Sequence, residues 1–329
     1  MLRRTHTLAL VVTLAASLAS TMVGCATASS APAPGPARSV GLSLAEATAL
    51  VDGFEARQVP PGKKPAAPTS LDECLAVLKS DRLDLFPDAV KFLQAQTTPE
   101  AAAMRAQMQL AWGEAELTVA EVLASLADRL DERVRALQVR KLVGAERAAL
   151  EADQAKLNLY RDTDQALRLL AAEHVAAGMV DAKVVIGGKP DDYVGYRVAA
   201  DAHRLRNEWK EFSAMVVKVE ETNPDSNGLV FLRGVAAQMR DGDAVEASKL
   251  YRQALERDPQ FVRAQAQLVL VQTNIFEQKK ELEKLRAIAP DHQIVRWAGP
   301  GIEDAHQVAL ERQQAIQAAA AARPAPATK

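Results

Sequence analysis

The segment from Pro99 to Gly178 most strongly constrains the fold, because it contains no further proline and its apolar residues recur at helical spacing. The recurring apolar positions in its middle are Val119, Leu123, Leu126, Leu130, Val134 and Leu137. Steps of three and four residues are the period of an α-helix and not of a β-strand. A single helix of this length would be unusual, so we expect breaks near Gly113, near Gly144 and at 158–164. The pattern predicts two or three long antiparallel helices.

The composition is that of an all-α protein. Alanine is abundant, aromatic residues make up 4% of the chain, and good helix formers predominate over β-branched runs. We therefore expect residues 71–183 to form a helical bundle of antiparallel hairpins. A continuous coiled coil is the weaker interpretation, because two successive four-residue steps and Lys141 disturb a strict heptad.

The first 24 residues have the composition of an export signal. Arg3 and Arg4 precede an apolar stretch at 8–19, which is too short and too rich in small residues for a lasting membrane span. The residues that follow, Met22-Val23-Gly24-Cys25, resemble the lipobox of bacterial lipoproteins. In that family the chain is cut before the cysteine, whose thiol is acylated, so the resemblance implies a lipid anchor at Cys25. An ordinary signal peptide with an incidental Cys25 is the alternative.

The resemblance also implies a location for the protein. Ala26 follows the cysteine, at the place where an aspartate would resemble an inner-membrane retention signal. We therefore expect anchoring in the lipid bilayer of the outer membrane, on its periplasmic face. Two or three acyl chains hold a protein there almost irreversibly, because each buried methylene contributes about 0.8 kcal/mol. With Cys25 acylated, Cys74 has no disulfide partner, and we expect it to be a buried, inert thiol.

The residues after the lipobox are expected to form a tether. Residues 25–70 are rich in Ala, Pro, Ser and Gly, and such segments cannot bury enough apolar surface to offset the entropy of ordering them. A helix-capable piece at 43–56 interrupts this segment, and we expect it to lie outside the folded core. The folded part of the chain can then stand away from the membrane.

A second resemblance lies at residues 242–259, which read GDAVEASKLYRQALERDP. Gly242-Asp243 form a turn and Asp258-Pro259 end a helix. Between them, one face of that helix carries Ala247, Leu250, Tyr251, Ala254 and Leu255. The segment resembles the turn and second helix of a tetratricopeptide repeat (TPR), in which residues at these positions pack two helices together. The preceding helix, at 229–240, offers Phe231 and Val235 to the same contact.

One repeat cannot bury its own apolar face, so neighbouring repeats are required. Upstream, Tyr196 precedes a second helix that carries Trp209 and Phe212 and ends at Pro224. Downstream, another helix pair ends at Pro290. The terminal prolines, with Pro259 between them, are 35 and 31 residues apart, close to the family period of about 34. The resemblance implies a TPR-like α-solenoid over residues 184–290, followed by a capping helix and a disordered tail over 291–329.

No pattern in the sequence predicts a catalytic, cofactor or metal site. The histidines lack the spacing of a zinc-binding helix, and there is no nucleophile elbow. Glu114 and Glu116 lie two residues apart on a helix, so they do not face each other as an acid and a base, and we expect both to be solvated. The formal net charge of −2 argues against nucleic acid as a partner, because phosphate binding requires a basic surface. We therefore expect neither an enzyme nor a metal-binding protein.

Two functional hypotheses remain, and both rest on resemblance. TPR arrays bind a peptide or a helix in a concave groove, so the chain resembles lipoprotein scaffolds that bind a protein or peptide partner in envelope assembly or secretion. The combination of lipobox, helical body and degenerate repeats also resembles the T-component lipoproteins of periplasmic TRAP-type ligand transport systems. A deep apolar pore would favour the transport accessory, and a shallow polar groove would favour the scaffold.

Overall fold

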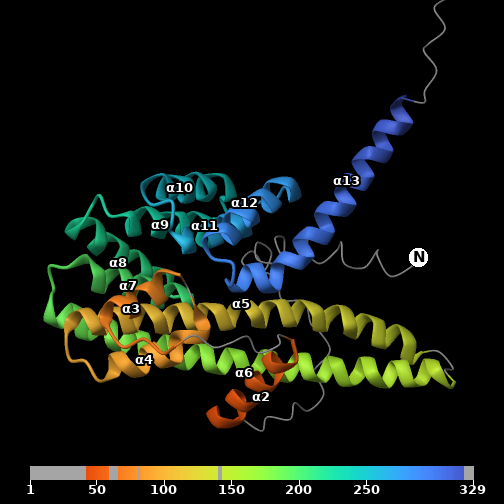
Figure 1. Ribbon diagram of the computed structural model, residues 1–329, viewed down its shortest axis with the longest axis horizontal. Coiled ribbons are helices and arrows are strands. Elements are labelled where there is room, and N and C mark those ends of the chain that lie inside the picture. The colour runs from red at the N-terminus through yellow and green to blue at the C-terminus, as the bar shows by residue number, and fades with distance from the viewer. Residues whose placement is uncertain (1–41, 59–65, 81, 140–142, 322–329) are drawn as a thin grey trace, which may run out of the picture. The chain divides into compact units, whose positions relative to one another are not determined.

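The computed structural model describes residues 42–58, 66–80, 82–139 and 143–321 (Figure 1). Every regular element in these ranges is a helix, which confirms the predicted all-α class. The described chain divides into two compact units, residues 42–236 and residues 237–321. The boundary between the two units lies inside the predicted repeat region, residues 184–290.

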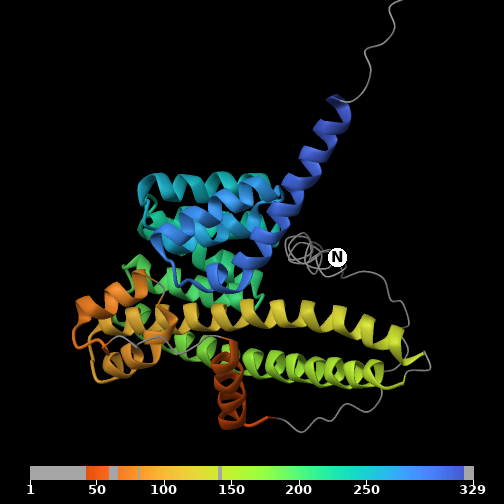
Figure 2. The same ribbon diagram turned by 45° about the vertical axis from the view of Figure 1, so that its right-hand side comes forward.

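Two long antiparallel helices form the frame of the first unit (Figures 1 and 2). They are α5 (Pro99–Gln138) and α6 (Ala145–Gly188). The hydroxyl of Thr98 accepts a hydrogen bond from the amide of Ala101 and Pro99 opens the first turn, as expected of this helix start. Gly144, with a φ of 55°, ends the turn between the helices, because glycine adopts this conformation without steric cost.

Only one of the three predicted helix breaks occurs, at Gly144. Gly113 does not break α5. A glycine is needed there because α6 packs so closely that a Cβ atom at residue 113 would lie 3.1 Å from the carbonyl oxygen of Ala171. The residues 158–164 continue α6, and the hydroxyl of Thr163 donates to the carbonyl of Leu159 within the helix. Tertiary packing thus overrides the weak helix propensity of glycine and of this polar stretch.

Three short helices flank the hairpin. They are α2 (Leu44–Gln58), α3 (Leu71–Lys79) and α4 (Phe86–Gln94). Helices α3 and α4 pack on α5 around the buried Phe86 and Cys74. Burial raises the pKa of the Cys74 thiol, which agrees with the inert thiol that we expected. Helix α2 contacts α6 and buries Ala47 and Val51, so this part of the predicted tether belongs to the folded unit.

Three further helices complete the first unit, namely α7 (Tyr193–Leu205), α8 (Trp209–Thr222) and α9 (Asn227–Val235). A π-helical turn, Ala236–Arg240, follows α9. The second unit contains α10 (Ala244–Arg257), α11 (Val262–Val271), α12 (Ile275–Ile288), a second π-helical turn (Ile294–Ala298) and α13 (Gly299–Ala321). Each of α10, α11 and α12 packs against the next helix of the chain. The three helices that we predicted to end before a proline do so at Asn223, Asp258 and Ala289.

The first third of α13 packs in the second unit, where Ile302 and Ala305 are buried. From Glu311 to Gln317 every residue is exposed, and the helix extends away from α10–α12 (Figure 2). Within the described residues, no helix combines the length and apolar character that crossing a membrane requires.

Candidate functional site

The residues predicted to pack the repeats together differ in their exposure to solvent. The buried ones are Phe212, Phe231, Val235, Ala247, Tyr251 and Ala254. The half-buried ones are Tyr196, Trp209 and Leu250, and Pro259 is exposed. Pro259 is therefore not part of the buried core. Its role is to end α10, because proline has no backbone N–H and cannot continue a helix.

The structure brings three of these residues together, all of them in the first unit. In the first unit, Phe212 packs with Leu229 and Leu232, and Tyr196 and Trp209 lie against this cluster. The Trp209 and Phe212 rings meet edge to face, with centroids 5.5 Å apart. In the second unit, the hydroxyl of Tyr251 donates to Gln238 Oε1 at 2.6 Å and joins α10 to the π-helical turn before it.

A group of buried charges lies where α5 meets α7. Arg204 on α7 is 4% exposed. Its guanidinium lies 3.0 Å from a carboxylate oxygen of Glu114 on α5 and 3.4 Å from one of Asp201 on its own helix. Burying these charges is costly, and the pairing offsets that cost. The expectation that Glu114 is solvated is wrong, because α7 covers this side of α5.

Glu116 is also buried, which corrects the second half of the same expectation. It faces α6, where His174 Nε2 lies 3.4 Å from its Oε1. The other ring nitrogen of His174 lies 2.6 Å from Gln109 Oε1, and the imidazole stacks on Trp112 with centroids 4.0 Å apart. The two glutamates therefore engage different helices, as their spacing predicted, and they do not form an acid/base pair.

A third polar contact joins α5 to α6. Arg105 donates two hydrogen bonds to the carboxylate of Asp181, at 2.7 and 2.5 Å, and a third to the carbonyl of Leu93 at 3.0 Å. The hydrogen bonds to Asp181 raise the pKa of the Arg105 guanidinium. Sequence reasoning missed this pair and the Arg204 cluster, because the partners on different helices are far apart in the chain and carry no local signal.

These polar groups hold neighbouring helices together. Each carboxylate is engaged by a cation or an imidazole on a neighbouring segment. Within the described ranges, no three His, Cys, Asp or Glu side chains converge as metal ligands would. The Glu114, Glu116 and Asp181 contacts therefore fix the spacing of α5, α6 and α7.

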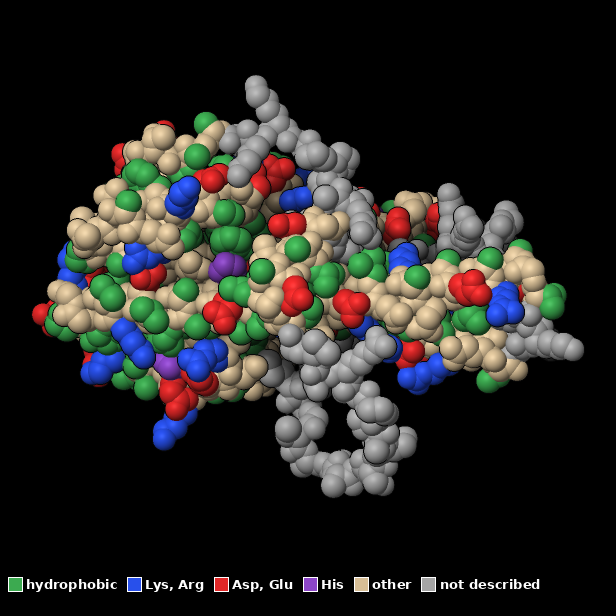
Figure 3. Space-filling model, turned by 90° about the horizontal axis from the view of Figure 1, so that it is seen from below, with side chains coloured by type: hydrophobic (Ala, Val, Ile, Leu, Met, Phe, Trp, Pro, Cys, Tyr) green, Lys and Arg blue, Asp and Glu red, His purple; other side chains and the backbone are tan. Residues whose placement is uncertain are grey.

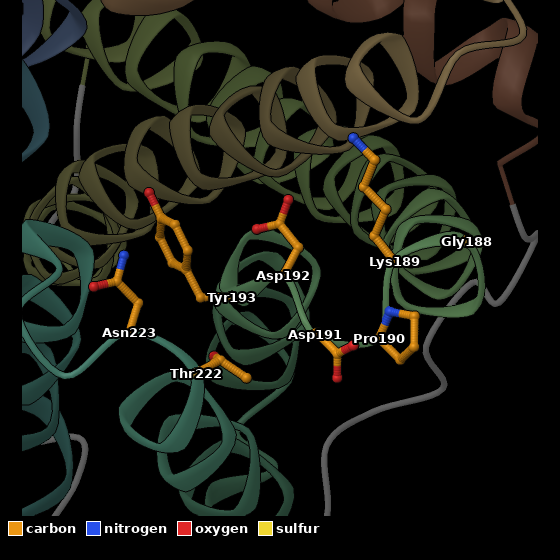
Figure 4. Close-up of a pocket in the computed structure, with 8 residues that line it drawn as sticks. All are labelled: Gly188, Lys189, Pro190, Asp191, Asp192, Tyr193, Thr222 and Asn223. Atoms are coloured by element: carbon orange, nitrogen blue, oxygen red, sulfur yellow. The ribbon is translucent and has the colours of Figure 1, made fainter.

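An open depression of about 500 Å³ lies where α6 leads into α7 (Figure 4). It is lined by Gly188, Lys189, Pro190, Asp191, Asp192, Tyr193, Thr222 and Asn223. The side chain of Asp192 caps α7 by accepting from the amide of Val194 at 3.0 Å. Lys189 points toward α5 and pairs with Glu100 there. The hollow is open, polar and apolar surface line it about equally, and Tyr193 is its one aromatic lining residue.

The charges on the face shown in Figure 3 are mixed, with Lys and Arg side chains interspersed among Asp and Glu side chains. A surface of this kind presents no field of one sign to steer a charged partner.

Cys25, the predicted lipidation site, lies outside the described residues. No protein-family model matches the chain, and no curated protein is significantly similar to it.

Proposed function

We propose that this chain is a lipid-anchored, periplasmic helical scaffold that binds a protein or peptide partner. The observation that carries the proposal is the open depression between α6, α7 and the end of α8, which is accessible from solvent. A peptide can reach such a surface from solvent, and exposed acceptors and an aromatic ring are suited to hold it. A carrier of small ligands would instead enclose its ligand in a largely apolar cavity, so the scaffold is favoured over the transport accessory.

The helix pairs give the proposal a second support. Helices α7 and α8 form one pair, and α11 and α12 form another, each ended by a proline at the repeat boundary. Paired helices of this kind are the units of TPR arrays, which bind peptides.

Site-specific photo-crosslinking in the protein's own cells tests partner binding. A photoreactive residue at Asp191, which is exposed and lines the depression, should yield a discrete protein adduct that mass spectrometry identifies. The same residue at Glu256, which is exposed on α10, serves as the matched control. Adducts of equal abundance at both positions, or none at Asp191, would count against a binding site in this depression.

Metabolic labelling with a clickable fatty acid tests the anchor separately. The wild-type chain should take up the label, and the Cys25→Ser variant should not. A label that persists in the variant would show that the lipobox resemblance is misleading, whatever the crosslinking result.

A further inference from the structure

The outer face of the C-terminal half of α6 is apolar and open to solvent. Val180 is 62% exposed and Val184 is 56% exposed. Ala172, Ala176 and Gly187 on the same face are also exposed, and Leu169 is half-buried. Helices α2, α5 and α7 contact other faces of α6. A helix on the surface of a soluble unit ordinarily turns polar residues to this side.

The exposed charges on this part of α6 are few and of opposite sign. From residue 169 to residue 187, Glu173 and Lys183 are the exposed charged residues. Neither forms an ion pair within the described part of the chain. They lie on opposite sides of Gly178 at equal distances along the helix, so this face is complementary to itself in an antiparallel arrangement.

The sizes of the side chains follow the same symmetry. In an antiparallel pair related by a twofold axis at the level of Gly178, each residue lies opposite the residue equally far from 178. Large residues then face small ones, with Val180 opposite Ala176, Val184 opposite Ala172, and Leu169 opposite Gly187. Successive positions 172, 176, 180 and 184 form one ridge at four-residue spacing, the kind that interdigitates in helix packing.

We propose that this face of α6, which we call the α6 outer face, binds a second copy of the chain in an antiparallel, twofold-symmetric contact. Both Glu173–Lys183 pairs form at once in this arrangement, because a twofold interface repeats every contact. The helix face is smaller than the roughly 1,200–2,000 Å² of a standard interface, so association is weak and depends on concentration. The inference concerns self-association and does not rest on the proposed partner binding.

Sedimentation velocity of the full chain over about two decades of concentration tests the contact. The wild-type chain should pass from monomer to dimer. Lys183→Glu places glutamates opposite Glu173 of the other copy and should weaken dimerisation roughly tenfold or more, because like charges replace opposite ones. Glu173→Lys should do the same. The double variant Glu173→Lys/Lys183→Glu restores opposite charges and should recover the wild-type dissociation constant within about threefold.

Lys210→Glu is the matched control, because Lys210 is an exposed lysine on α8, outside the α6 outer face. It should leave the dissociation constant unchanged, and circular dichroism should show the same helix content in every variant. A wild-type chain that stays monomeric throughout overturns the proposal. So does a dimer that neither single charge reversal weakens, or one that the double variant fails to restore.

Discussion

Gly178 on α6 lies so close to Leu110 on α5 that a Cβ atom at residue 178 would be 2.8 Å from Leu110 Cδ2. Three residues further along α5 the situation is mirrored, since a Cβ atom at Gly113 would be 3.0 Å from Val175 Cγ2 on α6. The two long helices therefore cross at a point where only glycine leaves enough room on each side. The half-buried Arg105 pairs with Asp181 close to this crossing in sequence on both helices.

The first prediction concerns this crossing. Gly178→Ala should destabilise the first unit by about 1–3 kcal/mol, because overpacking forces the helices apart despite alanine's better helix propensity. Gly187→Ala is the control, since nothing lies within 4 Å of a Cβ atom there, and it should leave stability unchanged or raise it by up to about 1 kcal/mol through alanine's better helix propensity. Denaturant melts of the two variants measure the difference. Equal stabilities would mean that the helices do not approach so closely.

The second prediction concerns α2. Ala47 is fully buried and Ala49, on the same helix, is exposed. Ala47→Glu should place an unpaired carboxylate against α6 and lower the unfolding free energy by about 1–3 kcal/mol. Ala49→Glu should cost less than about 0.5 kcal/mol, because its carboxylate stays in water. If Ala47→Glu proves as stable as Ala49→Glu, then α2 is the detached tether segment that the sequence predicted.

The third prediction concerns the repeat-like helix α10. Ala254 is fully buried, and Gln253 beside it is exposed. Ala254→Glu forces a carboxylate into a packed contact, where overpacking costs about 1–3 kcal/mol before the buried charge is counted. Gln253→Glu introduces the same residue at the neighbouring position and should cost under about 0.5 kcal/mol. Denaturant melts that differ by less than about 1 kcal/mol would contradict the packing of this stripe.

The fourth prediction is a pH dependence at the junction of α12 and α13. Glu303 on α13 lies 2.6 Å from Arg286 on α12, and the hydrogen bond from Arg286 lowers the pKa of Glu303. The folded-state pKa lies below the unfolded value, so this contact stabilises the fold above the unfolded pKa of about 4.3. Its contribution is lost as the pH falls through the lower folded-state value. Exposed pairs of this kind contribute on the order of 0.2–1 kcal/mol.

Thermal melts of the wild type and Glu303→Gln measure this dependence. The variant should melt at a lower temperature at neutral pH, and the two midpoints should converge in acid, where the wild-type Glu303 is itself protonated. Glu311→Gln on the exposed part of α13 is the control and should track the wild type at every pH. A difference between wild type and Glu303→Gln that stays constant with pH would rule out the ion pair as its source.

The sequence by itself determined the fold class and several helix ends. Apolar residues spaced three and four apart predict a helix from local sequence alone, because the position of a residue in the chain determines which side of the helix it lies on. The Thr98 cap, the Gly144 turn and the prolines after α8, α10 and α12 act on neighbouring backbone groups, so these boundaries were predictable.

Only the tertiary structure decided which helices meet and which charges are buried. From local sequence, Gly113 predicted a helix break. In the structure it lies in the middle of α5, where its lack of a side chain lets α6 pack closely. The sequence predicted that Glu114 and Glu116 are solvated. The residues that contact them, Arg204 on α7 and His174 on α6, lie far away in the chain. Pairing between segments so distant in the chain depends on the path of the whole chain, and a local sequence pattern carries no record of it.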